Sequence, residues 1–240
     1  MSRWVLVTRE EAELGELQGR LPDGVRLVAF PVLRLSPWES AQPWEALEGQ
    51  LGKLSALAFT SRHAPGAFLA QARVRGLAEP LLCLPAAAVG AATARACHEA
   101  GFAVHLVGDG GGARLAQLML QRFPRPLVVA FPCGRDHREE LVEELSAAGA
   151  TVLSVPVYAM ALTPREELPQ LPEGLPSAVV VTSPRAAQAY WQATGGGFAT
   201  VPHLALGPTT AVALANLGLN PKALAKPSTE KLLEELCRIL

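Results

Sequence analysis

The chain contains two copies of one sequence pattern, and this repeat restricts the folds that it can adopt. Residues 56–69 (ALAFTSRHAPGAFL) align without gaps on residues 178–191 (AVVVTSPRAAQAYW), with five of fourteen positions identical. Residues 88–104 align on residues 205–221, with six of seventeen identical. Each copy spans about 120 residues, too long a period for a solenoid. The repeat therefore predicts two similar domains and a binding cleft between them.

Short apolar segments alternate with helical patterns along most of the chain. Segments that are apolar throughout and separated by helices are typical of parallel sheets covered by helices on both faces. The predicted class is therefore α/β. The expected strands are residues 4–8, 26–30, 56–60, 103–107, 127–131, 151–155, 178–182 and 203–206, and the helical patterns include 137–148 and 228–239.

Composition and charge exclude several classes of protein. The formal net charge of −1 argues against a general nucleic-acid or polybasic membrane binder. The apolar stretches are too short to span a bilayer, and the start MSRWVLVTRE is typical of a first strand, not of a signal peptide. Four widely separated cysteines indicate reduced thiols in a cytoplasmic protein. The five histidines show no metal-binding spacing, so we expect no metal.

Each copy has two turns in which a strand is followed by small or hydroxyl residues and then by a helix. Ligands of open parallel sheets bind at the carboxyl ends of the strands, where helix N-termini offer unpaired N–H groups. These turns therefore predict an anion site built from backbone amides and hydroxyls. The turns are Thr60-Ser61-Arg62, Thr182-Ser183-Pro184, Gly90-Ala91-Ala92-Thr93 and Gly207-Pro208-Thr209-Thr210, with a third kind of loop at Phe131-Pro132-Cys133-Gly134-Arg135.

Structural roles compete with these functional ones. Ser, Thr and Pro at such positions are ordinary helix caps. Tyr158 is either a proton donor in a cleft or a packed phenol at a domain junction. Cys133 is interpreted as a buried thiol. Arginines that follow strands could reach acidic substrates, although an exposed arginine is usually only solvated: Arg9, Arg62, Arg135 and Arg185.

One apparent cofactor motif is set aside. Residues 108–113 (GDGGGA) follow a strand and fit the dinucleotide pattern G-x-G-x-x-A. They do not lie in the first βαβ unit, and no acidic residue follows a strand about twenty residues later to bind a ribose. The segment is interpreted as a loop that opens a helix.

The ordered set of motifs resembles the uroporphyrinogen-III synthase family. These motifs extend over the whole chain, and as a set they are more specific than any one alone. They are VLVTRE (5–10), FTSRHAPGAF (59–68), VGAATARACHEAGF (89–102), FPCGRDHREELVEEL (131–145), VPVYAM (155–160), VVVTSPRAAQAY (179–190), ALGPTTAVAL (205–214) and KPSTEKLLEEL (226–236).

The resemblance implies a fold of two flavodoxin-like or Rossmann-like domains with exchanged halves. Residues 1–35 would join residues 160–240 in one domain, and residues 36–159 would form the other. A two-stranded connector would use the segments at about 30–37 and 155–164, each of which contains a proline.

The resemblance also implies a reaction. The linear tetrapyrrole hydroxymethylbilane, with eight carboxylates, would lose water and close with ring D inverted through a spiro intermediate. Neither cofactor nor metal would be needed. The protein would be a cytoplasmic monomer, and the preceding bilane-forming enzyme would hand over the substrate transiently.

Residue roles follow from matching positions in the family. Tyr158 matches the connector tyrosine that is favoured as general acid. Thr93 and Thr210 match the cleft threonines, and the hydroxyl turns near the substrate match Thr60, Ser61, Thr182 and Ser183. From the turns themselves we further expect carboxylates to bind the backbone amides at Gly90–Ala92, Cys133–Arg135 and Gly207–Thr209, and Arg9 is a candidate contact because it follows a strand.

Two other functions fit the same pattern. A non-catalytic two-domain protein could close on a small anionic ligand, and a regulatory relative of the synthase could bind a tetrapyrrole without converting it. A nucleotide-dependent enzyme using residues 108–113 is a third alternative. Product formation separates the synthase from all three.

Overall fold

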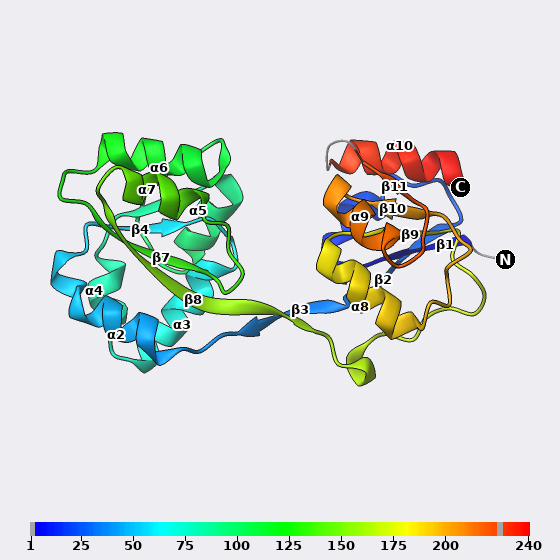
Figure 1. The fold of residues 1–240 in the computed structure, drawn as a ribbon, viewed down its shortest axis with the longest axis horizontal. Helices are drawn as coiled ribbons and strands as arrows, with labels where there is room; N and C mark the ends of the chain where they lie inside the picture. The colour runs from blue at the N-terminus through cyan, green and yellow to red at the C-terminus, as the bar shows by residue number, and fades with distance from the viewer. Residues whose placement is uncertain (1–2, 225–227) are drawn as a thin grey trace. The chain divides into compact units, whose positions relative to one another are not determined.

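The computed structural model describes residues 3–224 and 228–240, and the chain divides into two compact units (Figure 1). Unit 1 is formed by Met1–Arg34 and Ala161–Leu240, and unit 2 by Leu35–Met160. The chain therefore passes from one unit to the other twice. Residues 226 and 227, which begin the last motif, lie outside the described residues.

Unit 2 is built on a six-stranded sheet with the order β3-β8-β7-β4-β5-β6. Every pairing from β8 to β6 is parallel. Its strands are β3 (Leu33–Pro37), β4 (Ala56–Phe59), β5 (Ala86–Ala88), β6 (Val104–Val107), β7 (Val128–Gly134) and β8 (Thr151–Leu162). Its helices are α2 (Ala41–Gly49), α3 (Ala64–Val74), α4 (Ala78–Leu82), α5 (Ala91–Glu99), α6 (Gly111–Arg122) and α7 (Glu140–Ala147), with a 3-10 turn at Leu51–Lys53.

Unit 1 repeats this plan on a five-stranded parallel sheet with the order β11-β10-β9-β1-β2. Its strands are β1 (Arg3–Val7), β2 (Val25–Ala29), β9 (Ala178–Val181), β10 (His203–Ala205) and β11 (Pro221–Ala223). Its helices are α1 (Gly15–Gln18), α8 (Pro184–Thr194), α9 (Pro208–Ala215) and α10 (Thr229–Ile239), with 3-10 turns at Glu11–Glu13 and Arg165–Glu167.

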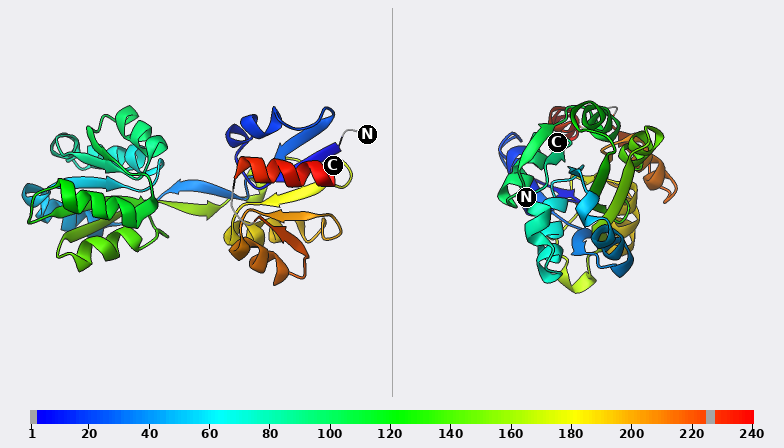
Figure 2. Two further views of the ribbon diagram at one scale, coloured as in Figure 1. Left: turned by 90° about the horizontal axis from the view of Figure 1, so that it is seen from above. Right: turned by 90° about the vertical axis from the view of Figure 1, so that its left-hand side faces the viewer.

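The wholly apolar strands explain why helices cover both faces of each sheet (Figure 2). In β1, Trp4 and Leu6 pack with α8 and α9, whereas Val5 and Val7 pack with α1 and α10. In β4, the two faces divide between α2–α5 and α6–α7. Successive strand residues point to opposite faces, so a strand buried on both sides must be apolar at every position.

The structure confirms the predicted α/β class, and it adds three strands. β3, β5 and β11 are not among the expected strands, and β5 consists of three alanines, which favour helix. The supposed loop at 131–135 is instead the end of β7, which continues to Gly134. β8 extends to Leu162 past Pro156, although proline is usually a strand breaker.

The two passages between the units form a two-stranded ribbon of β3 and β8. The N–H of Trp38 donates to the Val157 carbonyl (3.1 Å), and the N–H of Thr163 donates to the Val32 carbonyl (3.0 Å). Residue numbers increase along one strand as they decrease along the other, so β3 and β8 are antiparallel. The Thr163 hydroxyl also donates to the Pro31 carbonyl.

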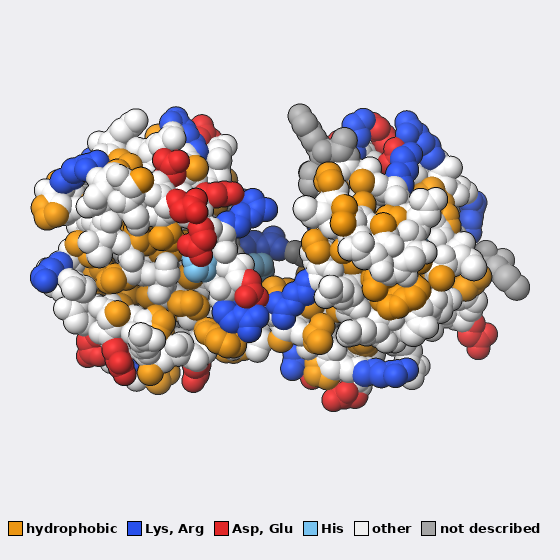
Figure 3. Space-filling model, viewed as in Figure 1, with side chains coloured by type: hydrophobic (Ala, Val, Ile, Leu, Met, Phe, Trp, Pro, Cys, Tyr) orange, Lys and Arg blue, Asp and Glu red, His pale blue; other side chains and the backbone are white. Residues whose placement is uncertain are grey.

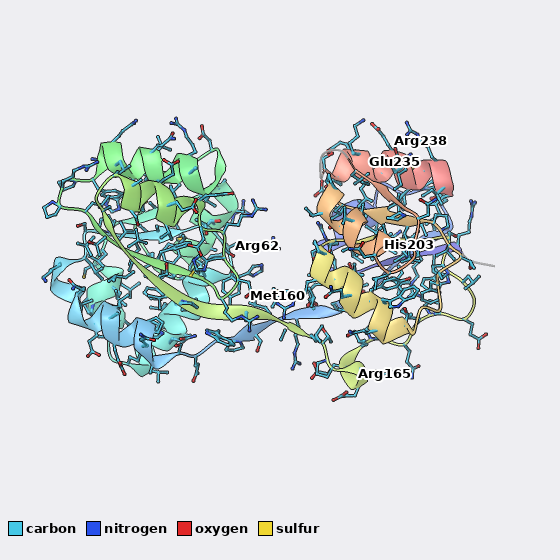
Figure 4. The ribbon with its side chains drawn as sticks, in the orientation of Figure 1. Arg62, Met160, Arg165, His203, Glu235 and Arg238 are labelled. Carbon is cyan, nitrogen blue, oxygen red and sulfur yellow. The ribbon has the colours of Figure 1, made fainter. Side chains whose placement is uncertain are left out.

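A buried pair, Tyr190 and His203, lies within unit 1 (His203 is labelled in Figure 4). The His203 Nδ1 donates to the Val201 carbonyl (2.9 Å), which leaves Nε2 to accept from the Tyr190 hydroxyl (3.0 Å). Burial lowers the pKa of His203 below its usual value and raises the pKa of Tyr190. The structure therefore requires a neutral imidazole here.

The Tyr190–His203 pair predicts a loss of stability in mild acid. Below about pH 6.5, His203 becomes protonated in the unfolded chain but stays neutral in the folded chain. The free energy of unfolding therefore falls. We expect the Tm to drop by roughly 2–8 °C between about pH 7.5 and about pH 5.5. In His203→Gln, which cannot titrate, the drop should be smaller. An unchanged drop in that variant, measured by thermal melts at both pH values, would contradict this assignment.

Candidate functional site

A polar pocket of about 290 Å³ lies at the carboxyl ends of the strands of unit 2. Loops after β4 and β7, the start of α6 and the side of β8 all contribute to it. We call it the Tyr158 pocket. Its lining includes Thr60, Ser61, Gly111, Gly112, Gly134, Asp136, His137 and Tyr158.

The ring of Tyr158 lies directly over Gly134. The two residues are partners in the ladder of β7 and β8, so both face the same side of the sheet. A Cβ atom at position 134 would stand 2.9 Å from the ring Cε2 and 3.1 Å from the phenol oxygen. Only glycine leaves room for the phenol at this place.

The Tyr158 phenol is half-buried and hydrogen-bonded to the side chain of Ser61. Burial raises the pKa of Tyr158 above its usual value, and the bond from Ser61 partly offsets this effect. The Ser61 oxygen also accepts the N–H of His63 (3.2 Å), and the His63 ring meets the Tyr158 ring edge to face at 6.0 Å. The phenol is therefore protonated at neutral pH.

Two groups in the pocket were not predicted from the sequence. His137 approaches the Gly134 carbonyl through Nδ1 (3.0 Å) and Glu139 through Nε2 (3.4 Å). Gly111 and Gly112 belong to the glycine segment 108–113, which opens α6 as predicted. The glycine segment was noted in the sequence only as an incomplete dinucleotide motif, and no metal spacing marked His137.

In the segment Cys133–Arg135, the backbone amide of Arg135 has a partner within the fold. The N–H of Arg135 donates to the Tyr158 carbonyl (2.8 Å), so this amide is not available to a substrate carboxylate. The Arg135 guanidinium pairs with Asp136 through two hydrogen bonds (2.9 and 3.0 Å) and stacks over Trp38 at 4.9 Å. Cys133 is fully buried, and burial raises its thiol pKa to about 12. The interpretation as a structural thiol agrees with this environment.

The hydroxyl turn of unit 1 differs from its counterpart in unit 2. The Thr182 hydroxyl donates to the Thr8 carbonyl, and its N–H donates to the Thr8 hydroxyl (3.2 and 3.1 Å). Ser183 caps α8 by accepting the N–H of Ala186 (3.1 Å). These two side chains therefore have structural partners, whereas the equivalent Ser61 contacts the phenol of Tyr158.

The glycine-threonine turns of the two units have the same local structure. Gly90 and Gly207 are extended residues that precede α5 and α9, and Thr93 and Thr210 lie in the first turns with only 5% and 3% of their surface exposed. The intervening residues are exposed: Ala91, Ala92, Pro208 and Thr209. None of these residues lines the Tyr158 pocket as described.

Arg9 is exposed and borders a different pocket in unit 1. That pocket, of about 220 Å³, lies beside the start of α10 and includes Glu16 and Ser228. Elsewhere, basic and acidic side chains are interspersed over the face shown in Figure 3. In the part of the chain that the structure describes, no helix is long and apolar enough to cross a membrane.

Comparison with known proteins gives one consistent result. The sequence model of the family described as uroporphyrinogen-III synthase HemD matches residues 21–234. A crystal structure of a mutant uroporphyrinogen III synthase from the extremely thermophilic bacterium Thermus thermophilus has a TM-score of 0.58 and 21% identity, covering 99% of this chain and 98% of that chain. A crystal structure of uroporphyrinogen-III synthetase from Helicobacter pylori has a TM-score of 0.66 and 17% identity, covering 99% and 100%. At these identities the two structures show a shared fold, which confirms the predicted two-domain architecture.

The contact between Gly134 and Tyr158 predicts the effect of a single methyl group. In Gly134→Ala the new Cβ must push the ring away, and overpacking of this kind costs about 1–3 kcal/mol. We expect a lower Tm and at least a tenfold loss of any activity that depends on the phenol. The matched control is Gly66→Ala in α3, where nothing lies within 4 Å of the added Cβ. Equal Tm values and equal activities in the two variants would show that the close approach of Tyr158 to Gly134 has no consequence.

Proposed function

Because the chain belongs to the uroporphyrinogen-III synthase family, lyases of porphyrin and haem biosynthesis, we propose that it converts hydroxymethylbilane to uroporphyrinogen III with inversion of ring D. The observation that carries the mechanism is the Tyr158 phenol, which is half-buried, protonated and open to a pocket at the carboxyl ends of the strands. Enzymes commonly place proton donors in such surroundings.

The reaction needs one proton donor and strict control of geometry. Tyr158 donates its proton as the C–O bond of the ring A hydroxymethyl group breaks, and water leaves with formation of an azafulvene that is protonated on nitrogen. The substituted carbon of ring D attacks this centre and forms a spiro intermediate. The bond between this ring D carbon and the methylene bridge to ring C then breaks, and the unsubstituted carbon of ring D attacks the bridge carbon and loses a proton. That proton restores the phenol, so the balance is loss of one water.

The direction of the hydrogen bonds favours this role. The Ser61 oxygen accepts the N–H of His63 (3.2 Å), and we propose that its own hydroxyl hydrogen is donated to the Tyr158 oxygen. The phenol hydrogen then points away from Ser61 and is available to a substrate hydroxyl. When the proton leaves, the Ser61 hydroxyl stabilises the developing phenolate, as a positioned donor should.

Binding of the eight carboxylates is proposed to be distributed. Backbone amides of the turns at Gly90–Ala92 and Gly207–Thr209 lie at helix starts, where the dipole favours anions. Thr60 and Arg9 are proposed as further contacts, while Thr182 and Ser183 contribute by holding their turn. A binding cleft between the two halves stays a prediction. So do the absence of a cofactor, the monomeric state, the hand-over from the preceding enzyme and the cytoplasmic location.

A coupled assay tests the proposed function. Hydroxymethylbilane is generated in situ, the protein is added, and the oxidised products are separated by chromatography. Mostly isomer III would support the synthase. Only isomer I, formed at the spontaneous rate by folded protein, would contradict it and favour a tetrapyrrole sensor or a non-catalytic binder.

Loss of the phenol hydroxyl should slow the reaction without unfolding the chain. In Tyr158→Phe the ring still packs over Gly134, while the proton donor is gone. We expect kcat to fall at least several-fold and up to about 10²-fold, with little change in KM. The measurement is the rate of isomer III formation, with circular dichroism to verify the fold. Full activity of the folded variant would contradict the role of the phenol as general acid.

Distributed binding predicts that no single threonine is essential. Thr93→Ala and Thr210→Ala each remove one hydroxyl from a helix start and leave the backbone amides in place. We expect each variant to keep at least about a tenth of the wild-type kcat/KM, a loss of about 1.4 kcal/mol or less. A variant that is folded but completely inactive would show that binding depends on that side chain.

A further inference from the structure

The side chain of Gln71, in α3, is a buried amide whose hydrogen-bonding groups are all engaged. Its oxygen accepts the indole N–H of Trp44 (3.1 Å). Its nitrogen donates to the Trp38 carbonyl and to the Val157 carbonyl, both at 3.0 Å. One side chain with 7% of its surface exposed thus joins α2, the end of β3 and the middle of β8 to α3.

Val157 is the point at which the ladder of β7 and β8 is irregular. Cys133 pairs with Pro156 and the next residue, Gly134, pairs with Tyr158, so Val157 has no partner in β7. Such a β-bulge redirects the side chain that follows it. Here that side chain is Tyr158, and the bulge is what places its ring over Gly134.

Gln71 adds a side-chain hydrogen bond at the bulge, beside the backbone bond that Val157 makes to the segment after β3. The Val157 carbonyl accepts both the Trp38 N–H (3.1 Å) and the Gln71 amide, and the Trp38 carbonyl accepts the second N–H of the same amide. The next carbonyl, that of Tyr158, is held from the other side by the N–H of Arg135 (2.8 Å). The backbone is therefore fixed on both sides of the bulge.

Neighbouring contacts hold Gln71 in turn. The Arg75 guanidinium stacks over Trp44 at 4.6 Å and donates to the Gln71 backbone carbonyl (3.1 Å). Trp44 also stacks on Phe68 at 5.1 Å. The amide therefore has little freedom to choose other partners.

Tyr158 also borders a second open space. Tyr158 also lines a mainly apolar groove of about 570 Å³ between α3 and β3, together with Val74 and Leu35. Gly134 offers no side chain to hold the ring from the opposite side. The backbone at the bulge therefore contributes to where the phenol lies, together with the contacts to Ser61 and His63.

We propose that Gln71 is a positioning residue for Tyr158: its buried amide fixes the bulge at Val157 and thereby aims the phenol into the Tyr158 pocket. This inference rests on the proposed function in so far as it predicts rates. Gln71 does not line the Tyr158 pocket and acts only through Val157.

The first test is a double-mutant cycle with Gln71→Met, which keeps the volume and removes all three hydrogen bonds. We expect kcat to fall about tenfold with KM within about twofold, since small displacements of a reacting group are enough for such losses. In the Tyr158→Phe background the same substitution should have no further effect. An equal fall in both backgrounds would overturn the proposal.

The second test does not depend on catalysis. The chain has two tyrosines, and the pKa of Tyr190 is well above the usual range, so the first phenolate absorbance to appear at alkaline pH reports on Tyr158. The midpoint should shift in Gln71→Met, because burial and the Ser61 bond both depend on the position of the ring. An unchanged midpoint would overturn the proposal. Full activity of Tyr158→Phe would contradict only the proposed function, and the titration would still test the position of the ring.

Gln18 provides a matched control. Its amide joins α1 to β2 in unit 1, donating to the Val25 carbonyl (3.0 Å) and accepting the Leu27 N–H (2.6 Å). Gln18→Met should lower the Tm without changing kcat or the Tyr158 titration. If Gln71→Met does not fold, Gln71→Glu takes its place. This variant keeps the volume and the bond from Trp44, but an ionised carboxylate cannot donate to the two carbonyls. The same two measurements and outcomes apply.

Discussion

The bulge at Val157 is the feature on which the candidate site depends. It interrupts the pairing of β7 and β8 by one residue and turns the ring of Tyr158 onto Gly134. The same strand continues into the ribbon with β3, so one segment both joins the two units and presents the phenol. A site built in this way places a proton donor by backbone geometry and needs few other reactive side chains.

Much of the fold could be predicted from hydrophobic pattern and repetition. Wholly apolar strands such as Val179–Val181 indicate a sheet covered on both faces, and the second copy of the motif predicts a second unit. The pattern failed where tertiary contacts override local preference. By local preference, the three alanines of β5 would form a helix. Their small side chains nevertheless suit a fully buried strand between β4 and β6. The full length of β8 was not predicted, because Pro156 lies within it and proline pairs poorly in a strand ladder.

The candidate site was predictable only where residue type and position agree. Tyr158, Ser61 and Thr60 follow or belong to strands and carry hydroxyls, and the structure brings them to one pocket. The equivalent Thr182 and Ser183 have the same pattern, but Thr182 bonds to Thr8 and Ser183 caps α8, which no sequence pattern distinguishes. Gln71 and His137 act through contacts formed only in the folded chain, so the sequence gives no signal for them.

The central claim is that the Tyr158 phenol contacts the bilane. The most direct measurement is NMR of protein labelled at the ζ-carbon of tyrosine, in which two tyrosines give two resonances. A stable bilane with a methyl group in place of the hydroxymethyl group serves as the ligand. We expect the Tyr158 resonance to shift on saturation while that of buried Tyr190 does not. Saturable binding by calorimetry with an unmoved Tyr158 resonance would contradict it.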